Sequence, residues 1–197
     1  MKNSLLLQTA TVLALSVPMV SMAESQLVVG NTATATARLG VSVVIPRVLF
    51  LGVGTGSTGL TNDTTVDSVT FNYTNNPQAV GQGTAANQIT GNVVPVRVVG
   101  NNGNITLSAS TTGPLANGAG DTIPWTQITA TSSQATLPAP VIPDTGAGAT
   151  VNVTPSTGKV TDRSANWTFS YANTVTPPAG TYGGTASSRV IYTAAMP

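Results

Sequence analysis

Few side chains in this chain could carry out acid–base or nucleophilic chemistry. Its 197 residues include no His and no Cys, so it lacks an imidazole base, a thiolate nucleophile and a thiolate metal ligand. Five Asp and one Glu are its acidic side chains, and they are scattered among predicted turns. Asp63 and Asp67 are close in sequence, but the residues around them lack the ligand spacing of a known calcium loop. We therefore expect a protein with no enzymatic activity, no cofactor and no metal centre.

The glycine-rich segment 54–59 matches G-x-G-x-x-G and follows an apolar run, as a dinucleotide-binding fingerprint does. That fingerprint works only when a helix follows, because the N–H groups at the start of the helix hold the pyrophosphate. Residues 60–65 are turn-rich and β-branched, with no helical pattern. The segment therefore favours a glycine turn between strands.

Asp144-Thr-Gly is the turn sequence of aspartic proteases, which need two such turns sharing a proton. The chain has one copy, and Pro143 interrupts the strand that would lead into it. Asp-Thr-Gly is also ordinary turn chemistry. We interpret it as a structural turn.

The aromatic residues Trp125, Trp167, Phe169 and Tyr171 admit two interpretations. They could form a sugar-binding platform, or they could pack in a core. The last three alternate along one segment, as side chains on one face of a strand do. Core packing is the favoured interpretation.

The composition favours an all-β protein. Charged residues are only 7% of the chain, whereas apolar residues reach 41%. One Glu and two Lys leave little material for amphipathic surface helices. Thr and Val, both abundant, fit a pleated and half-buried surface. The runs of Val, Ile and Leu also argue against disorder.

Residues 1–23 have the features of a secretory signal peptide: a basic start at Lys2, an apolar segment over 5–15 and a small-x-small cleavage site at 21–23. The apolar segment is too short to span a bilayer, and no later stretch reaches the roughly 18 apolar residues needed. Cleavage leaves six basic and six acidic side chains. This balance argues against nucleic acid or anionic membrane as a partner. We expect an exported protein that passes through the periplasm to the cell surface or beyond.

The mature chain begins with two contrasting segments. Residues 32–38 alternate Thr and Ala almost perfectly, which is the period of a β-strand. Residues 39–53 are the most hydrophobic stretch, interrupted by Pro46. We expect an N-terminal extension over 24–40 and a single β-sandwich domain over 41–197, with residues 41–53 in the core of this chain.

Further strands are predicted over 66–74, 89–99, 104–110, 150–153, 166–172 and 189–193. Asn101-Asn-Gly103 is a tight-turn signal and predicts a hairpin between the second and third of these. Pro95 predicts an edge position or a bulge, and the proline-rich segment 137–143 predicts a surface crossing. Eight to ten short strands with regular turn signals indicate an antiparallel, immunoglobulin-like β-sandwich.

In overall plan the chain resembles the cysteine-free subunits of chaperone–usher fimbriae, such as enterobacterial colonisation-factor pilins. The resemblance lies in the signal peptide, the alternating segment behind it, the Thr/Val/Gly-rich body and the closing sequence from Pro178 through Tyr182 to Val190–Thr193. The closing strand is also similar to that of WxL-type surface domains, although the Trp-x-Leu motifs are absent.

The fimbrial resemblance implies a structural subunit that polymerises by donor-strand complementation. A periplasmic chaperone would fill an exposed groove, and after delivery to an outer-membrane usher the next subunit's extension would replace it. The donor residues on this hypothesis are Ala33, Ala35, Ala37 and Leu39. The groove or core residues are Val41, Val43, Ile45, Val48, Phe50, Tyr182, Val190 and Tyr192.

The alternative is a self-complete, secreted β-sandwich that stays monomeric and binds carbohydrate or another surface protein. The two hypotheses differ in whether the N-terminal strand is lent to a neighbour or kept.

Overall fold

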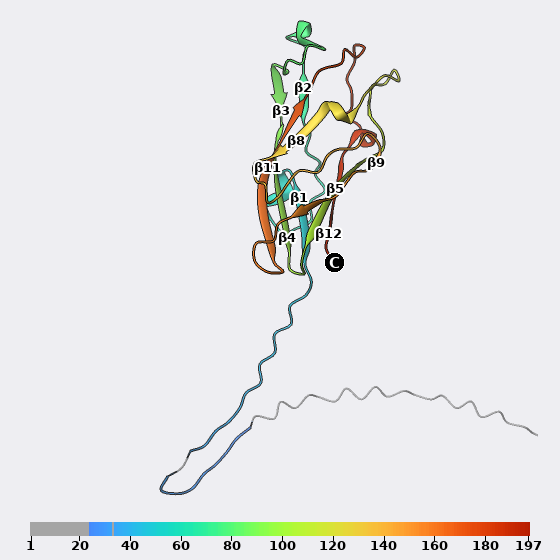
Figure 1. The fold of residues 1–197 in the computed structure, drawn as a ribbon. Coiled ribbons are helices and arrows are strands. Elements are labelled where there is room, and N and C mark those ends of the chain that lie inside the picture. Colours follow the sequence, from blue (N-terminus) through green and yellow to red (C-terminus); the bar gives the residue numbers. More distant parts are fainter. Residues whose placement is uncertain (1–23, 33) are drawn as a thin grey trace, which may run out of the picture. The chain divides into compact units, whose positions relative to one another are not determined.

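The computed structural model describes residues 24–32 and 34–197 of the chain (Figure 1). The predicted signal peptide and Ala33 lie outside these described residues. The chain divides into two units, Met1–Ile45 and Pro46–Pro197. In the first unit, the described residues form no helix or strand. The compact unit thus begins at Pro46 rather than at Val41.

The first sheet of the compact unit has four strands, all antiparallel to their neighbours, in the order β1-β4-β11-β8. Its two central strands are the longest and alternate buried and exposed side chains. This alternation follows from the two-residue period of a strand with one face on a core. The bounds of the four strands are β1 Leu49–Val53, β4 Val93–Gly100, β11 Thr161–Tyr171 and β8 Ile128–Ser132.

The second sheet is built around one central strand, β5, which pairs with β12 on one side and with β10 and β9 on the other. Its strands are β5 Ile105–Thr111, β12 Ile191–Ala195, β10 Val151–Val153 and β9 Gly146–Ala147. Two small ribbons are separate from both sheets: β2 Thr70–Asn72 with β3 Gln88–Thr90, and β6 Leu115–Ala116 with β7 Thr122–Ile123. Short 3-10 turns complete the described structure: η1 Thr55–Thr58, η2 Pro77–Ala79, η3 Trp125–Gln127 and η4 Ala186–Ser188.

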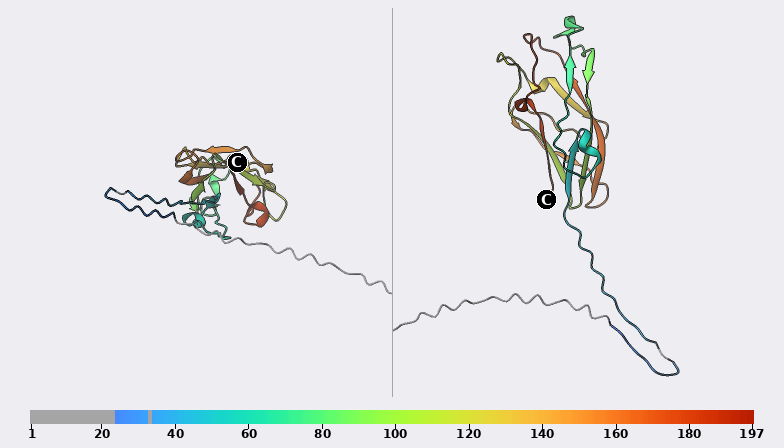
Figure 2. Two further views of the ribbon diagram at one scale, coloured as in Figure 1. Left: turned by 90° about the horizontal axis from the view of Figure 1, so that it is seen from below. Right: turned by 180° about the vertical axis from the view of Figure 1, so that it is seen from behind.

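The two larger sheets face each other and share one hydrophobic core (Figure 2). Strand β4 contributes Val96 and Val98, β5 contributes Ile105 and Leu107, and β11 contributes Trp167, all of them almost completely buried. Full burial of one such side chain is worth about 1.5–3 kcal/mol. The all-β, antiparallel prediction is confirmed, although the described residues form twelve short strands rather than eight to ten.

The predicted hairpin at Asn101–Gly103 is wrong. The turn connects β4 to β5, and these strands lie in different sheets. Each already has strand neighbours on both sides, β1 and β11 for β4 and β12 and β10 for β5. Both edges of β4 and of β5 are thus already paired with other strands. The turn at residues 101–103 therefore connects the two sheets and does not form a hairpin.

The expected edge position of Pro95 is confirmed locally, although β4 as a whole is a central strand of its sheet. The last pair between β1 and β4 joins Val53 to Val96, so β4 has no strand neighbour on that side at Pro95. The Pro95 carbonyl oxygen accepts a hydrogen bond from the Gly54 N–H at 2.8 Å. Because the N and O of one strand residue point to the same side, the missing N–H of Pro95 costs no ladder bond.

The segment 137–143 has no regular strand, as expected, but it crosses the surface only in part, at the exposed Val141. Leu137 and Pro140 are fully buried, and Ile142 is nearly so. The Leu137 carbonyl oxygen accepts hydrogen bonds from Ser132 Oγ at 2.7 Å and from Trp167 Nε1 at 3.3 Å. Prolines reduce the number of N–H groups that a buried segment must satisfy, so this one can place some of its residues beneath the surface.

Asn173 is buried and fastens the loop around η2 to the end of β11. Its Nδ2 donates to the carbonyl oxygens of Ala79 at 2.6 Å and Thr84 at 2.8 Å, and its Oδ1 accepts from the Gly81 N–H at 2.8 Å. Its φ is 54°, a left-handed conformation that Asn tolerates better than most residues.

We predict that Asn173→Ala lowers the free energy of unfolding by about 2–4 kcal/mol, because buried backbone groups lose their partners and Ala is strained at positive φ. Asn173→Gly removes the same hydrogen bonds without the backbone strain. It should therefore lower the stability less, and the difference isolates the strain. Urea unfolding followed by the fluorescence of Trp125 and Trp167 measures both. Equal stability of wild type and the Ala variant would contradict this role.

Candidate functional site

The candidate site is the side of the compact unit where β1 and β12 are neighbours. These strands approach each other but no β-ladder joins them: β12 pairs only with β5, and β1 only with β4. Among the described residues, Ile191–Ala195 makes no backbone hydrogen bond outside the β5 ladder. The outer edge of β12 therefore presents unpaired N–H and C=O groups, which can template another strand.

The core is thinner along this side. Val190, Tyr192, Ala194 and Met196 alternate toward the core but are only partly buried, and Leu51 and Val53 of β1 are partly buried as well. The central residues of β4 and β5, which belong to the same core, are almost completely buried. We define the acceptor edge as these six residues together with the free backbone edge of β12.

Tyr192 links the acceptor edge to the centre of the core. Its ring packs edge-on against Trp167, with ring centroids 5.1 Å apart. Its hydroxyl is buried and has no hydrogen-bond partner among the described residues. Burial of this phenol raises its pKa well above the ordinary value.

Only part of the predicted groove or core set lies at the acceptor edge. Val190 and Tyr192 belong to it. Tyr182 lies in the preceding loop instead, where its hydroxyl donates to the Pro178 carbonyl at 2.7 Å. Val48 and Phe50 have the opposite parity to the core-facing Leu51 and Val53 of β1. Since a shift of one residue changes the face of a strand, these two do not line the core.

The expectation that Val41, Val43 and Ile45 belong to the core of this chain is wrong. Their side chains are 81%, 78% and 76% exposed, and Leu39 is 87% exposed. Strand β1 begins only at Leu49. Residues 41–45 lie before it and pair with no strand of the sheet. Four large apolar side chains at alternate positions are thus left in contact with solvent.

The predicted donor residues Ala35, Ala37 and Leu39 are exposed and extended, and Ala33 lies outside the described residues. Within residues 24–45, the Thr36 N–H donates to Gln26 Oε1 at 3.1 Å. The expected core segment 41–53 included Leu51 and Val53, which do pack against the core. The residues that the sequence analysis missed are Ala194 and Met196. The alternation of Val190 and Tyr192, continued to Met196, was the signal that could have identified these two.

The two motifs with a possible catalytic meaning have structural roles. Gly54–Gly59 forms the single turn η1, and the Asp67 carboxylate accepts from the Thr55 N–H at 2.6 Å and from Thr55 Oγ1 at 3.1 Å. The Asp144 carboxylate accepts from the Trp125 N–H at 2.5 Å. Both match the turn interpretations.

The aromatic residues follow the core interpretation. Trp125, Trp167 and Phe169 are buried, and Trp125 Nε1 donates to the Gly113 carbonyl at 2.7 Å. Tyr171 is partly buried and packs against Phe71, with ring centroids 6.1 Å apart. These side chains do not share an exposed face on which a sugar ring could stack.

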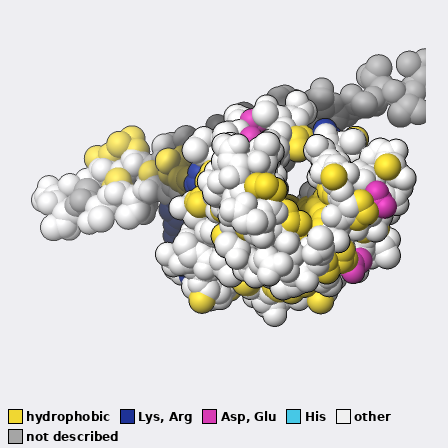
Figure 3. Space-filling view, turned by 90° about the horizontal axis from the view of Figure 1, so that it is seen from above, with side chains coloured by type: hydrophobic (Ala, Val, Ile, Leu, Met, Phe, Trp, Pro, Cys, Tyr) yellow, Lys and Arg dark blue, Asp and Glu magenta, His cyan; other side chains and the backbone are white. Residues whose placement is uncertain are grey.

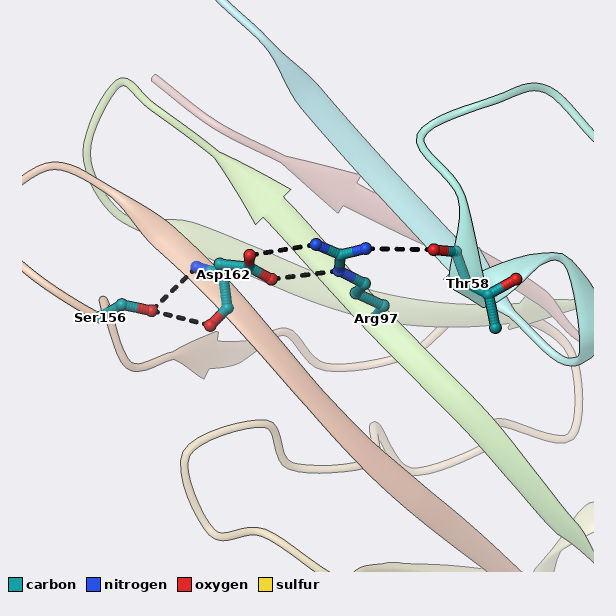
Figure 4. A network of polar contacts seen from close by, with 4 residues as sticks. All are labelled: Thr58, Arg97, Ser156 and Asp162. Atoms are coloured by element: carbon teal, nitrogen blue, oxygen red, sulfur yellow. Dashed lines mark hydrogen bonds and ion pairs between the residues drawn. The ribbon is translucent and has the colours of Figure 1, made fainter.

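A polar network lies on the outer face of the first sheet (Figure 4). Arg97 on β4 holds Asp162 on β11 through two contacts of 3.1 Å, and its Nη1 donates to the Thr58 carbonyl at 3.2 Å. Ser156 Oγ accepts from the Asp162 N–H and donates to the Asp162 carbonyl, both at 2.8 Å. The hydrogen bonds from Arg97 lower the pKa of the Asp162 carboxyl group.

An open polar hollow surrounds this network, lined by Ser57, Thr58, Pro95, Val96, Arg97, Ser133, Gln134, Asp162, Ser164, Ala165 and Asn166. Arg97 and Asp162 already satisfy one another, and the lining has no aromatic ring. Elsewhere the charge is sparse: the end of the molecule seen in Figure 3 carries separated acidic groups among mostly uncharged atoms. In the described part of the chain, no three acidic side chains gather into a metal-binding group.

Comparisons with known proteins give no match among family models, curated proteins or solved structures. Within the described residues, no helix has the length and apolar character required to cross a bilayer.

We predict that the stability of the protein is nearly constant between about pH 5 and pH 9, because a chain without His or Cys has few groups that titrate there. The lowered pKa of Asp162 stabilises the fold above the unfolded value of about 3.9, and this contribution is lost as the pH falls through the folded value. Above about pH 10, the raised pKa of Tyr192 makes stability decline with pH. Urea midpoints measured across pH test the profile.

Asp162→Asn and Arg97→Gln should each reduce the acid-side loss, because each removes the charged pair. Asp63→Asn is the matched control: the pKa of Asp63 is also lowered, first by the hydrogen bond from the Thr65 N–H, independently of Arg97. If only Asp63→Asn changed the acid limb, the pair would not be its source.

Proposed function

We propose that this protein is a structural subunit of an extracellular filament or fimbrial-type surface adhesin that polymerises by donor-strand complementation. One observation carries the proposal: an unpaired apolar acceptor edge and an unpaired apolar segment occur in the same chain, and both have a two-residue period. Strand addition needs these two parts, since main-chain hydrogen bonds give affinity and alternate side chains give specificity.

The exposures favour Leu39–Ile45 as the donated strand, shifted from the Ala33–Leu39 register that the sequence suggested. Leu39, Val41, Val43 and Ile45 place four large apolar groups on one face. Each is worth about 1.5–3 kcal/mol when fully buried, whereas ordering one backbone residue costs about 1–2 kcal/mol. Burial of side chains as small as that of Ala offsets less of this backbone ordering cost.

The acceptor edge has the complementary character. Its side chains are apolar and half-buried, so a strand placed against them removes apolar surface from water on both partners. The free edge of β12 offers the hydrogen bonds. A contact between the edge of one copy and the segment of another is heterologous and does not close, and such contacts produce filaments.

This function implies an exported protein and two further partners. An exposed apolar edge is prone to aggregation before assembly, so a periplasmic chaperone would cover it and an outer-membrane usher would receive the subunit. The proposed product is a homopolymer at the cell surface. The alternative, a monomeric sandwich that binds carbohydrate or a surface protein, requires the acceptor edge to stay unfilled or be filled by its own chain.

We predict that Val41→Asp with Val43→Asp abolishes polymer formation, because two carboxylates cannot be buried against an apolar edge. The mature chain is refolded from denaturant at high concentration and run on SDS gels with and without boiling. Wild type should give a ladder that collapses on boiling, and the double variant should give monomer. Both positions are exposed and outside the compact unit, so folding of that unit should not change.

Ala35→Asp with Ala37→Asp is the matched control, with the same added charge on the neighbouring exposed segment. It should keep the ladder. A ladder lost in the control but kept in the first variant would return the donor to the Ala33–Leu39 register. A wild-type chain that stays monomeric would favour the alternative function.

We also predict that a synthetic peptide of residues 38–47 stabilises the Val41→Asp, Val43→Asp chain, whose edge is vacant. A ligand that binds only the folded state at a hundredfold excess over its Kd adds about 2.7 kcal/mol to the free energy of unfolding. The same peptide carrying both Asp substitutions should add nothing. Urea unfolding with each peptide makes the comparison, and equal effects of the two would contradict apolar recognition.

A further inference from the structure

The segment that joins the donor residues to the sandwich is held by one side chain. Asn101 Nδ2 donates to the Pro46 carbonyl oxygen at 2.8 Å, and Asn101 Oδ1 accepts from the Val48 N–H at 2.8 Å. The side-chain amide of Asn101 thus pairs with one carbonyl and one N–H of Pro46–Val48, as the backbone of a neighbouring strand would. Asn101 follows the last residue of β4 in the turn that carries the chain to β5.

These two hydrogen bonds hold the leading segment, Pro46–Val48, immediately before the chain enters β1. Leu49, the first residue of β1, is opposite Gly100, so Pro46–Val48 passes beside the β4–β5 turn. Strand β12 ends there too: Ala195 is opposite Thr106, and Asn102 Nδ2 donates to the Pro197 carbonyl at 2.8 Å. Strand β1 therefore starts at the end of the sandwich where β12 finishes, and the two run in opposite directions.

These directions distinguish insertion of the chain's own segment from insertion of another copy's. If Leu39–Ile45 folded back along its own β1, it would run antiparallel to β1 and hence parallel to β12. The reversal would have to occur within Pro46–Val48, and both hydrogen bonds to Asn101 would break. A segment from a second copy has no such constraint and can lie antiparallel to β12, which is the slightly more stable pairing.

We propose that Asn101 is a positioning residue that keeps Pro46–Val48 extended and so prevents Leu39–Ile45 from entering its own acceptor edge. The edge is thereby reserved for the Leu39–Ile45 segment of a second copy, running antiparallel to β12. This inference rests on the proposed function. It adds the reason why the chain assembles with a neighbour instead of closing on itself.

The absence of native Cys allows a direct test. Val43→Cys is combined with Ala194→Cys, or in a second double variant with Val190→Cys, and the mature chain is oxidised after refolding. Adjacent strands bring Cα atoms within the range that a disulfide spans. Equal amounts of ¹⁵N-labelled and unlabelled protein are mixed before refolding, so mass spectrometry separates cross-links within a chain from those between chains.

In the double-Cys variants that keep Asn101 we expect cross-links between chains. Asn101→Ala should raise the ratio of intrachain to interchain cross-links about tenfold, since two hydrogen bonds that hold the leading segment are lost. Asn101→Asp, which keeps the acceptor for Val48 but loses the donor to Pro46, should give an intermediate ratio. Asn102→Ala removes the bond to Pro197 in the same turn and should leave the ratio unchanged.

The outcomes separate the two proposals. Interchain cross-links whose ratio is the same in Asn101→Ala and Asn102→Ala overturn the role of Asn101 and leave the proposed function standing. Cross-links found only within the chain, or none in either double-Cys variant that keeps Asn101, overturn both. Urea unfolding of Asn101→Ala serves as the folding check, and Asn101→Asp supplies the comparison if Ala lowers stability.

Discussion

The structure depends on the burial of apolar side chains between two sheets. The chain has no disulfide, and in the described residues its charged groups form one ion pair, on the surface between Arg97 and Asp162. Such pairs contribute little to stability. The closely packed faces of β4, β11 and β5, centred on Trp167, therefore supply most of the favourable free energy. This is why the remaining segments can be loops and two-residue strands.

The acceptor edge differs from the rest of this packed core in both backbone pairing and burial. At the centre of the two sheets, each buried strand has a neighbour on both sides and side chains from the opposite sheet above it. Along β12 and β1, one hydrogen-bonding neighbour is missing and the core-facing side chains are only half covered. Backbone pairing and apolar burial are thus incomplete at one place. A single additional strand with alternating apolar residues completes both, and Leu39–Ile45 has that pattern.

The polar side chains with well-defined geometry act on the connections between strands. Asn173 fastens the η2 loop to the end of β11, Asp67 and Asp144 satisfy backbone N–H groups in turns, and Asn101 holds Pro46–Val48 beside the β4–β5 turn. In a chain so poor in charge, amide and carboxylate side chains replace missing backbone partners. Asn101 is the one of these side chains that holds the segment before β1, which follows the exposed apolar residues 39–45.

Sequence patterns alone were enough to predict the all-β class, the burial of Trp167 and Phe169, and the turns at Gly54–Gly59 and Asp144. Each depends on local periodicity or on which residue types are present. Three features depend on the three-dimensional arrangement of the strands: β4 and β5 lie in different sheets, Leu137 is buried, and Val41, Val43 and Ile45 are exposed. Local patterns specify which face of a segment is apolar. They do not specify what that face meets, because strand pairing joins residues far apart in the sequence and depends on which edges other strands already use.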